Sequence, residues 1–183
     1  MRLIENRRLG AAAVILCALI SVFVLGGWKL HARHSALERI FVYGTEPRLM
    51  TRHSMDAYLD RCAQSASDLA QEAKRHSIDD ALIESALTHA DALTRTDGID
   101  GRYETYRSLT RAVEDLYTAL QTAGAEDAVN VTVAYHDYRS AQNLIQNDGY
   151  HAEASAYNEA VRAFPARAIA LIWGLEPAET YGR

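Results

Sequence analysis

The chain has 183 residues, of which 49% are hydrophobic, and carries a formal net charge of −5 at pH 7. That length allows one domain of ordinary size with a sizeable core, plus an appendage. Only 3 prolines and 10 glycines are present, so the composition favours helices over a turn-rich β architecture. Basic residues are in excess up to Arg48 and acidic residues beyond it, which argues against a nucleic-acid-binding face on the body of the protein.

The first predicted element is an apolar run from Leu9 to Trp28, which contains no charged residue. It has roughly the 20 positions that a helix needs to cross the hydrocarbon core of a bilayer. Trp28 ends the run, where interfacial aromatic residues are common. We therefore predict a retained single membrane span. The alternative is a cleaved signal peptide, whose apolar region of about 7–15 residues is shorter than this run.

Basic residues flank the run on both sides and leave its orientation open. The positive-inside rule needs an asymmetry of charge that this chain lacks. We expect a single-pass protein of a bacterial-type cell inner membrane, with the side of the folded body unresolved. The flanking residues are Arg2, Arg7 and Arg8 before the run, and Lys29, Arg33 and Arg39 after it.

Three regions are predicted along the chain. Residues 1–28 form the N-terminal flank and the span, and residues 29–48 form a juxtamembrane connector. Apolar residues at helical spacing allow this connector to prolong the membrane helix until Gly44 and Pro47 interrupt it. Residues 49–183 form a helical bundle with an apolar C-terminal segment.

From Leu49 onward, apolar residues recur every three to four positions and no segment is predicted as a strand. The fold class is therefore all-α, with an antiparallel, up-down bundle of about four helices after the membrane helix. The predicted inward stripes are Met55, Tyr58, Leu59, Cys62, Ala66, Leu69 and Ala73; Leu82, Ala86, Ala90 and Leu93; Tyr103, Tyr106, Leu109, Val113, Leu116, Tyr117 and Leu120; and Val131, Tyr135, Tyr138 and Ile145.

Capping and turn residues predict where these helices begin and end. Ser77 is the expected N-cap of the second bundle helix. Asp97–Gly98 and Asp100–Gly101 are expected turns before the third, and Gly124 is expected to end it. The spacing of three to four positions between large apolar residues is interrupted near Gly149, but a stripe of small residues continues through this point. We therefore predict one long last helix, kinked or locally unwound at that point.

The last stretch, from Tyr150 to Tyr181, combines a helical seam with a second apolar run, Ile169 to Leu175, that follows Pro165. We expect this run to plug the open end of the bundle; the alternative is an exposed surface for a partner or a bilayer. The pattern of the stretch resembles the C-terminal signature of the LemA family. The residues that carry it are Tyr157–Asn158, Val161, Phe164–Pro165, Ile169–Ala170, Trp173–Gly174, Pro177 and Tyr181.

The resemblance to the LemA family implies a single-pass membrane protein with an antiparallel α-helical bundle. It implies no catalytic residue. The chain departs from the family pattern from Thr51 to Leu59 and before Tyr150. For Tyr157 and Asn158 we expect structural roles, with Tyr157 in the helix seam and Asn158 bonded to another helix or capping the chain near Pro165.

The histidines are the first candidates for a chemical site. His31 and His34 are spaced like ligands on one helical turn, but no cysteine or carboxylate cluster stands beside them. Adjacent His136–Asp137 point apart on a helix, and His151–Glu153 lacks the Glu-x-x-His companion of di-iron bundles. We assign no catalytic, cofactor-binding or metal-binding residue and no cofactor.

Two cysteines are present, Cys17 in the apolar run and Cys62 on a core stripe, and we expect no disulfide between them. The predicted function is a non-enzymatic protein-interaction or scaffold module in the cell envelope. Its expected partners are the membrane, through Leu9 to Trp28, and a protein or a second copy of the chain, with no nucleic acid. The alternative is a ligand-sensing bundle of a membrane signalling system, which would need a polar-rimmed pocket between helices.

Overall fold

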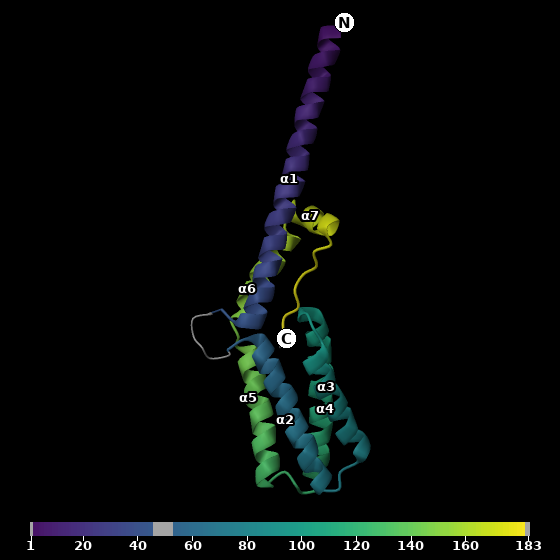
Figure 1. Cartoon of the computed structure of the whole chain (residues 1–183), viewed down its shortest axis with the longest axis vertical. Coiled ribbons are helices and arrows are strands. Elements are labelled where there is room, and N and C mark those ends of the chain that lie inside the picture. The colour runs from purple at the N-terminus through teal and green to yellow at the C-terminus, as the bar shows by residue number, and fades with distance from the viewer. Residues whose placement is uncertain (1, 46–52, 182–183) are drawn as a thin grey trace.

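The computed structural model describes residues 2–45 and 53–181 (Figure 1). Within these ranges the chain is all-α, as predicted. Its helices are α1 (Arg2–Tyr43), α2 (Met55–Arg75), α3 (Asp80–Arg95), α4 (Ile99–Thr122), α5 (Val129–Gln146), α6 (Tyr150–Arg162) and α7 (Ala166–Trp173).

Helices α2 to α5 form the packed body of the protein, and successive helices alternate in direction (Figure 1). Helix α2 packs against both α3 and α5, and α3 packs against α4. Leucine, isoleucine and tyrosine side chains fill the space between them, including the fully buried Leu59, Leu69, Leu116 and Ile145. The predicted up-down bundle is confirmed. Its physical basis is the hydrophobic effect: the apolar stripes of the helices are removed from water when they pack against one another.

Most of the predicted inward residues are buried, and the exceptions lie at the margins of the stripes. Leu82 is half-buried, and its neighbour Ile83 takes the core position of α3. Tyr103 and Tyr117 of α4 and Tyr135 of α5 are also half-buried, and the rings of Tyr117 and Tyr135 stack in parallel at 3.5 Å between centroids. A tyrosine at the edge of a core buries its ring while its hydroxyl group stays in water.

The predicted N-cap of α3 is wrong. Ser77 adopts a left-handed backbone conformation with φ of 54°, just after the end of α2. Asp79 is the N-cap instead, and its Oδ1 accepts a hydrogen bond of 2.9 Å from the backbone N–H of Ala81. Aspartate caps a helix at least as well as serine and also carries the negative charge that a helix N-terminus favours.

One of the two predicted turns before α4 is confirmed. Gly98 has φ of 83° and precedes the first residue of the helix. Asp100–Gly101 is not a turn but lies within the first turn of α4, which is a correction. Asp100 suits that place, because an acidic side chain stabilises a helix N-terminus. Gly124, with φ of 67°, follows the end of α4 as predicted.

The expected long last helix is divided into two. Helix α5 ends at Gln146, and α6 begins at Tyr150. Side chains satisfy the backbone groups that the break leaves without helical partners. Asp148 Oδ1 accepts a 2.7 Å hydrogen bond from the N–H of Tyr150, and His151 Nε2 lies 2.6 Å from the carbonyl oxygen of Ile145. These polar partners explain why the chain unwinds here rather than merely kinks.

Helix α1 continues without interruption through the predicted connector to Tyr43, and Gly44 follows it with φ of 80°. Pro47 and the junction at residues 48 and 49 lie outside the described residues. The part from Gly10 to Tyr43 is long and apolar enough to cross a membrane, with a mean hydropathy of 2.4 in its most apolar window. Only 6% of that window is buried, so it is no core helix, while an anchor and a signal sequence both meet this description.

A buried arginine of α4 ties that helix to two partly exposed carboxylates of α2. Arg102 is only 6% exposed, and its guanidinium donates to Asp56 and, at 2.6 Å, to Asp60. A second pair between helices, Arg61 of α2 with Asp137 of α5 at 3.5 Å, has both side chains about half exposed. The arginine is therefore buried in the first case and half exposed in the second, and Arg102 pairs with two carboxylates where Arg61 pairs with one.

We predict that Arg102→Ala lowers the free energy of unfolding by about 1–3 kcal/mol, since it leaves Asp56 and Asp60 without their charge-assisted bonds. Arg61→Ala, the matched control, should cost less than about 1 kcal/mol. Urea unfolding of the full chain in detergent, followed by circular dichroism, measures both. Equal losses in the two variants would contradict a special role for the buried arginine.

Candidate functional site

The C-terminal half of α1 is covered by the end of the chain. Helix α6 runs alongside it and α7 packs against it farther toward the N-terminus (Figure 1). Phe41 of α1 meets Tyr150 edge to face at 5.4 Å, and His34 meets Tyr157 in the same way at 5.6 Å. The segment that carries the family resemblance therefore joins the bundle to the candidate membrane helix.

After α7 the chain turns at Gly174 and returns along α6 as an extended tail, residues 175–181. Asn158 holds this tail with both ends of its amide group. Its Nδ2 donates to the carbonyl of Ala178 at 2.8 Å, and its Oδ1 accepts from the N–H of Ala178 at 2.7 Å. The expectation that Asn158 bonds another helix or caps the chain near Pro165 is therefore wrong.

Tyrosine hydroxyl groups complete the attachment of the tail. Tyr157 donates to the carbonyl of Glu176 at 3.2 Å, and Tyr150 donates to that of Glu179 at 2.9 Å. Burial raises the pKa of the Tyr150 and Tyr157 hydroxyl groups above the ordinary value for tyrosine, so both stay protonated and can donate. Tyr157 lies in the seam between α6 and α1, as predicted.

Tyr181 fastens the end of the tail to the bundle. Its hydroxyl group donates to the carbonyl of Ile99 at the start of α4, at 2.6 Å. Its ring lies 5.1 Å from that of Tyr103, 5.8 Å from that of Phe41 and 6.3 Å from that of Tyr150, measured between centroids. One buried side chain thus contacts α1, α4 and α6, and burial raises its pKa.

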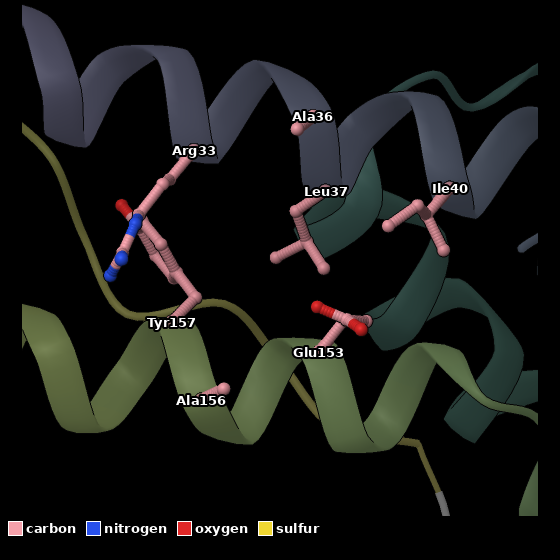
Figure 2. A pocket seen from close by; sticks show the side chains of 7 residues that line it. All are labelled: Arg33, Ala36, Leu37, Ile40, Glu153, Ala156 and Tyr157. Atoms are coloured by element: carbon pink, nitrogen blue, oxygen red, sulfur yellow. The ribbon is translucent and has the colours of Figure 1, made fainter.

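An open pocket of about 260 Å³ lies between α1 and α6 (Figure 2). Arg33 and Tyr157 lie together at one end, and the carboxylate of Glu153 faces Leu37 across the opening. Arginine binds carboxylates and phosphates through paired N–H groups, while a carboxylate binds amines. The pocket could therefore hold a small ligand that carries both charges. The residues that line it are Arg33, Ala36, Leu37, Ile40, Glu153, Ala156 and Tyr157.

A second open pocket, of about 480 Å³, lies where α1 meets α2 and α4. Four carboxylates line it, and the buried Arg102 pairs with two of them. That pairing neutralises part of the charge, which fits a structural role for the cluster. The lining residues are Glu38, Phe41, Val42, Asp56, Asp60, Thr94, Thr96, Asp97, Gly98, Ile99 and Arg102.

The histidines considered from the sequence are spread over three helices: His31 and His34 on α1, His136 on α5 and His151 on α6. His34 approaches Glu38 at 3.7 Å, whereas His31 is exposed. His151 bridges the break between α5 and α6, and its neighbour Glu153 points instead into the pocket beside α1. Among the described residues, no three His, Cys, Asp or Glu side chains are grouped closely enough to hold a metal ion.

The two cysteines are free thiols, Cys17 exposed on α1 and Cys62 buried in the core. Burial raises the pKa of Cys62 to about 12. A thiol with so high a pKa stays protonated near neutral pH, and the thiolate is the nucleophile. Cys62 therefore serves packing rather than covalent chemistry.

The predicted plug is also wrong. The apolar run from Ile169 to Leu175 buries Ile169 and Ala170 through the packing of α7 on α1 and α6, and it leaves Leu171 and Ile172 exposed. Sequence reasoning also missed Arg102, although a signal existed. Arg102 is the only charged residue on the inward stripe of α4, between Ile99 and Tyr106.

Comparisons with protein-family models, curated proteins and solved structures found no match. The fold itself defines the class: a helical bundle that follows one long apolar N-terminal helix.

We predict that Asn158→Ala releases the tail while the bundle stays folded. The change removes two hydrogen bonds to Ala178, each worth about 0.5–1.5 kcal/mol. Amide hydrogen exchange at Ala178, whose N–H group donates to Asn158, should therefore rise about ten-fold or more. Asn158→Asp, which keeps only the acceptor, should give an intermediate increase. Asn143→Ala, an exposed change on α5, is the control. Unchanged exchange in the tail of Asn158→Ala would contradict the role of Asn158 in holding the tail on α6.

Proposed function

We propose that α1 anchors the protein in a cell inner membrane as a single span from Leu9 to Trp28. The observation that carries this proposal is the exposed apolar surface of α1. An amphipathic helix of a soluble protein buries its apolar face and exposes its polar face to water. In contrast, α1 from Gly10 to Trp28 is apolar all round, and its N-terminal part extends away from the bundle (Figure 1). Its large exposed hydrophobic residues are Val14, Ile15, Leu16, Leu19, Ile20, Val22, Val24, Leu25 and Trp28.

We propose further that the bundle is a non-enzymatic interaction or scaffold module for a protein partner or a second copy of the chain. Its core is filled by side chains, and an acidic body suits a partner with a basic surface. The resemblance to the LemA family agrees with this architecture and stays a prediction. The side of the membrane on which the bundle lies is left open by the flanking charges.

The pocket between α1 and α6 favours one alternative, a ligand-sensing bundle. A sensor needs a polar-rimmed cavity between helices, and Arg33, Glu153 and Tyr157 supply such a rim. A ligand of this pocket should raise the melting temperature of the full chain but not that of Arg33→Ala. A ligand that stabilised both forms equally would bind elsewhere.

We predict that Leu16→Lys with Leu19→Lys, in the full chain, releases the protein from membranes. A lysine at the centre of a spanning helix costs about 2.5–3.5 kcal/mol. Extraction of cell membranes with alkaline carbonate should leave the wild type in the pellet and move the variant to the supernatant. Val133→Lys, on the exposed side of α5, is the matched control and should behave as the wild type. If the wild type is instead released, and mass spectrometry of the intact protein gives the mass of a chain that begins after Trp28, that result would show a cleaved signal peptide.

Crosslinking in native membranes tests the scaffold role. An amine-reactive crosslinker should reach Lys74, an exposed residue near the end of α2 and far along the chain from the span. We expect mass spectrometry to find peptides of a partner, or of a second copy, joined to Lys74, and expect Lys74→Arg to lose them because it keeps the charge but not the amine. Crosslinks confined to single chains would contradict the proposal.

A further inference from the structure

Helix α7 has a strongly apolar face that no described part of the chain covers. Leu171 is 84% exposed and Ile172 is 67% exposed. Phe164, just before the helix, is 90% exposed. A soluble surface shows large apolar residues singly rather than in such a cluster, so this face needs a partner.

The position of α7 along α1 indicates which partner. Ile169 packs against Gly26 and Trp173 against Gly27, at sites where a larger side chain on either glycine would collide with them. These glycines stand one and two residues before Trp28, the end of the apolar run. The axial rise of a helix is about 1.5 Å per residue, so α7 meets α1 within a few ångströms of the end of that run. Figure 1 shows α7 beside α1 at this level. A bilayer crossed by the run would therefore reach α7.

The charges around α7 also fit a membrane surface. Exposed basic residues stand on all three helices that meet here: Lys29 on α1, Arg162 on α6 and Arg167 on α7. Arg167 is the one charged residue on α7 itself, whereas the exposed acids Glu159, Glu176 and Glu179 lie on α6 and on the tail. Each lysine or arginine near an anionic membrane surface contributes about 1 kcal/mol of attraction.

We propose that α7 and Phe164 lie in the headgroup region of the bilayer that α1 crosses, with Leu171 and Ile172 toward the acyl chains. This inference rests on the proposed anchoring by α1. An amphipathic helix at an interface buries its apolar face about 5–10 Å into the boundary of headgroups and chains, with arginines toward the phosphates. The protein then meets the membrane twice, through a span and through a short helix in the plane of the surface.

Single-tryptophan forms of the full chain test this geometry. Trp173→Phe leaves Trp28 as the reporter of the span. A second form, Trp28→Phe with Trp173→Phe, lacks both native tryptophans. One new tryptophan is then added to this form, either Ile172→Trp on α7 or Val133→Trp on α5. Both added reporters replace exposed residues, so neither change touches the core. Each form is reconstituted into vesicles of phosphatidylcholine and phosphatidylglycerol, with and without bromine on the acyl chains.

We expect brominated lipid to quench Trp28 and the reporter at position 172 by comparable factors, on the order of two-fold, because both lie near the interface. The reporter at position 133 should be quenched by aqueous acrylamide and not by brominated lipid. Quenching of Trp28 without quenching at position 172 would overturn the inference and leave the anchor intact. Protection of position 172 from both quenchers would also overturn it, in favour of a protein partner or a second copy. No lipid quenching of Trp28 would overturn the anchor and the inference together.

Discussion

The contact of Phe41 with Tyr150 and Tyr181 is the constraint on which the arrangement of the protein depends. These three aromatic rings come from α1, from the start of α6 and from the last described residue of the tail. Aromatic rings in edge-to-face or tilted contact bury much apolar area and prefer a narrow range of geometries. Through them the long helix is held against the bundle by side chains as well as by the continuous chain.

Helix α1 passes through two environments, and its composition changes where its surroundings change. From Gly10 to Trp28 it is apolar all round, and most of its large side chains are exposed. Beyond that point it buries one stripe, Leu30, Leu37 and Phe41, and presents charged residues on its other sides. A stripe of this kind is what a helix needs to pack on a neighbour in water. The helix is continuous, so any tilt that α1 adopts in a membrane is passed to the bundle.

The features that could be predicted from the sequence are those that depend on local periodicity. Stripes such as Leu109, Val113 and Leu116 locate a helix and its buried face, because burial repeats with the helical period. At the edge of a stripe the same reasoning fails by one position, as with Leu82 and Ile83. The helix is then free to rotate by part of a turn to improve its packing, and only the neighbouring helices decide the outcome.

The attachment of the tail could not be predicted, since it depends on contacts between residues far apart in the chain. Asn158 and Ala178 are 20 positions apart, and Tyr181 and Ile99 are 82 apart. An extended segment has no period of its own, so its partners are set by the surface on which it lies. The same holds for α7, whose apolar pattern is equally compatible with a plug and with an exposed face. The glycines of α1 that accept it lie more than 140 positions earlier in the sequence.

The break between α5 and α6 explains how one chain builds both the bundle and its junction with α1. A continuous helix would carry Tyr150 and Tyr157 onward along the axis of α5. Unwinding three residues, Asn147 to Gly149, allows the following helix to take a direction of its own along α1. The hydrogen bonds of Asp148 and His151 across the break then hold that direction. With the tail tied at both Asn158 and Tyr181, the bundle keeps one orientation relative to α1. A fixed orientation suits a scaffold that presents one face at a membrane better than a sensor that must move.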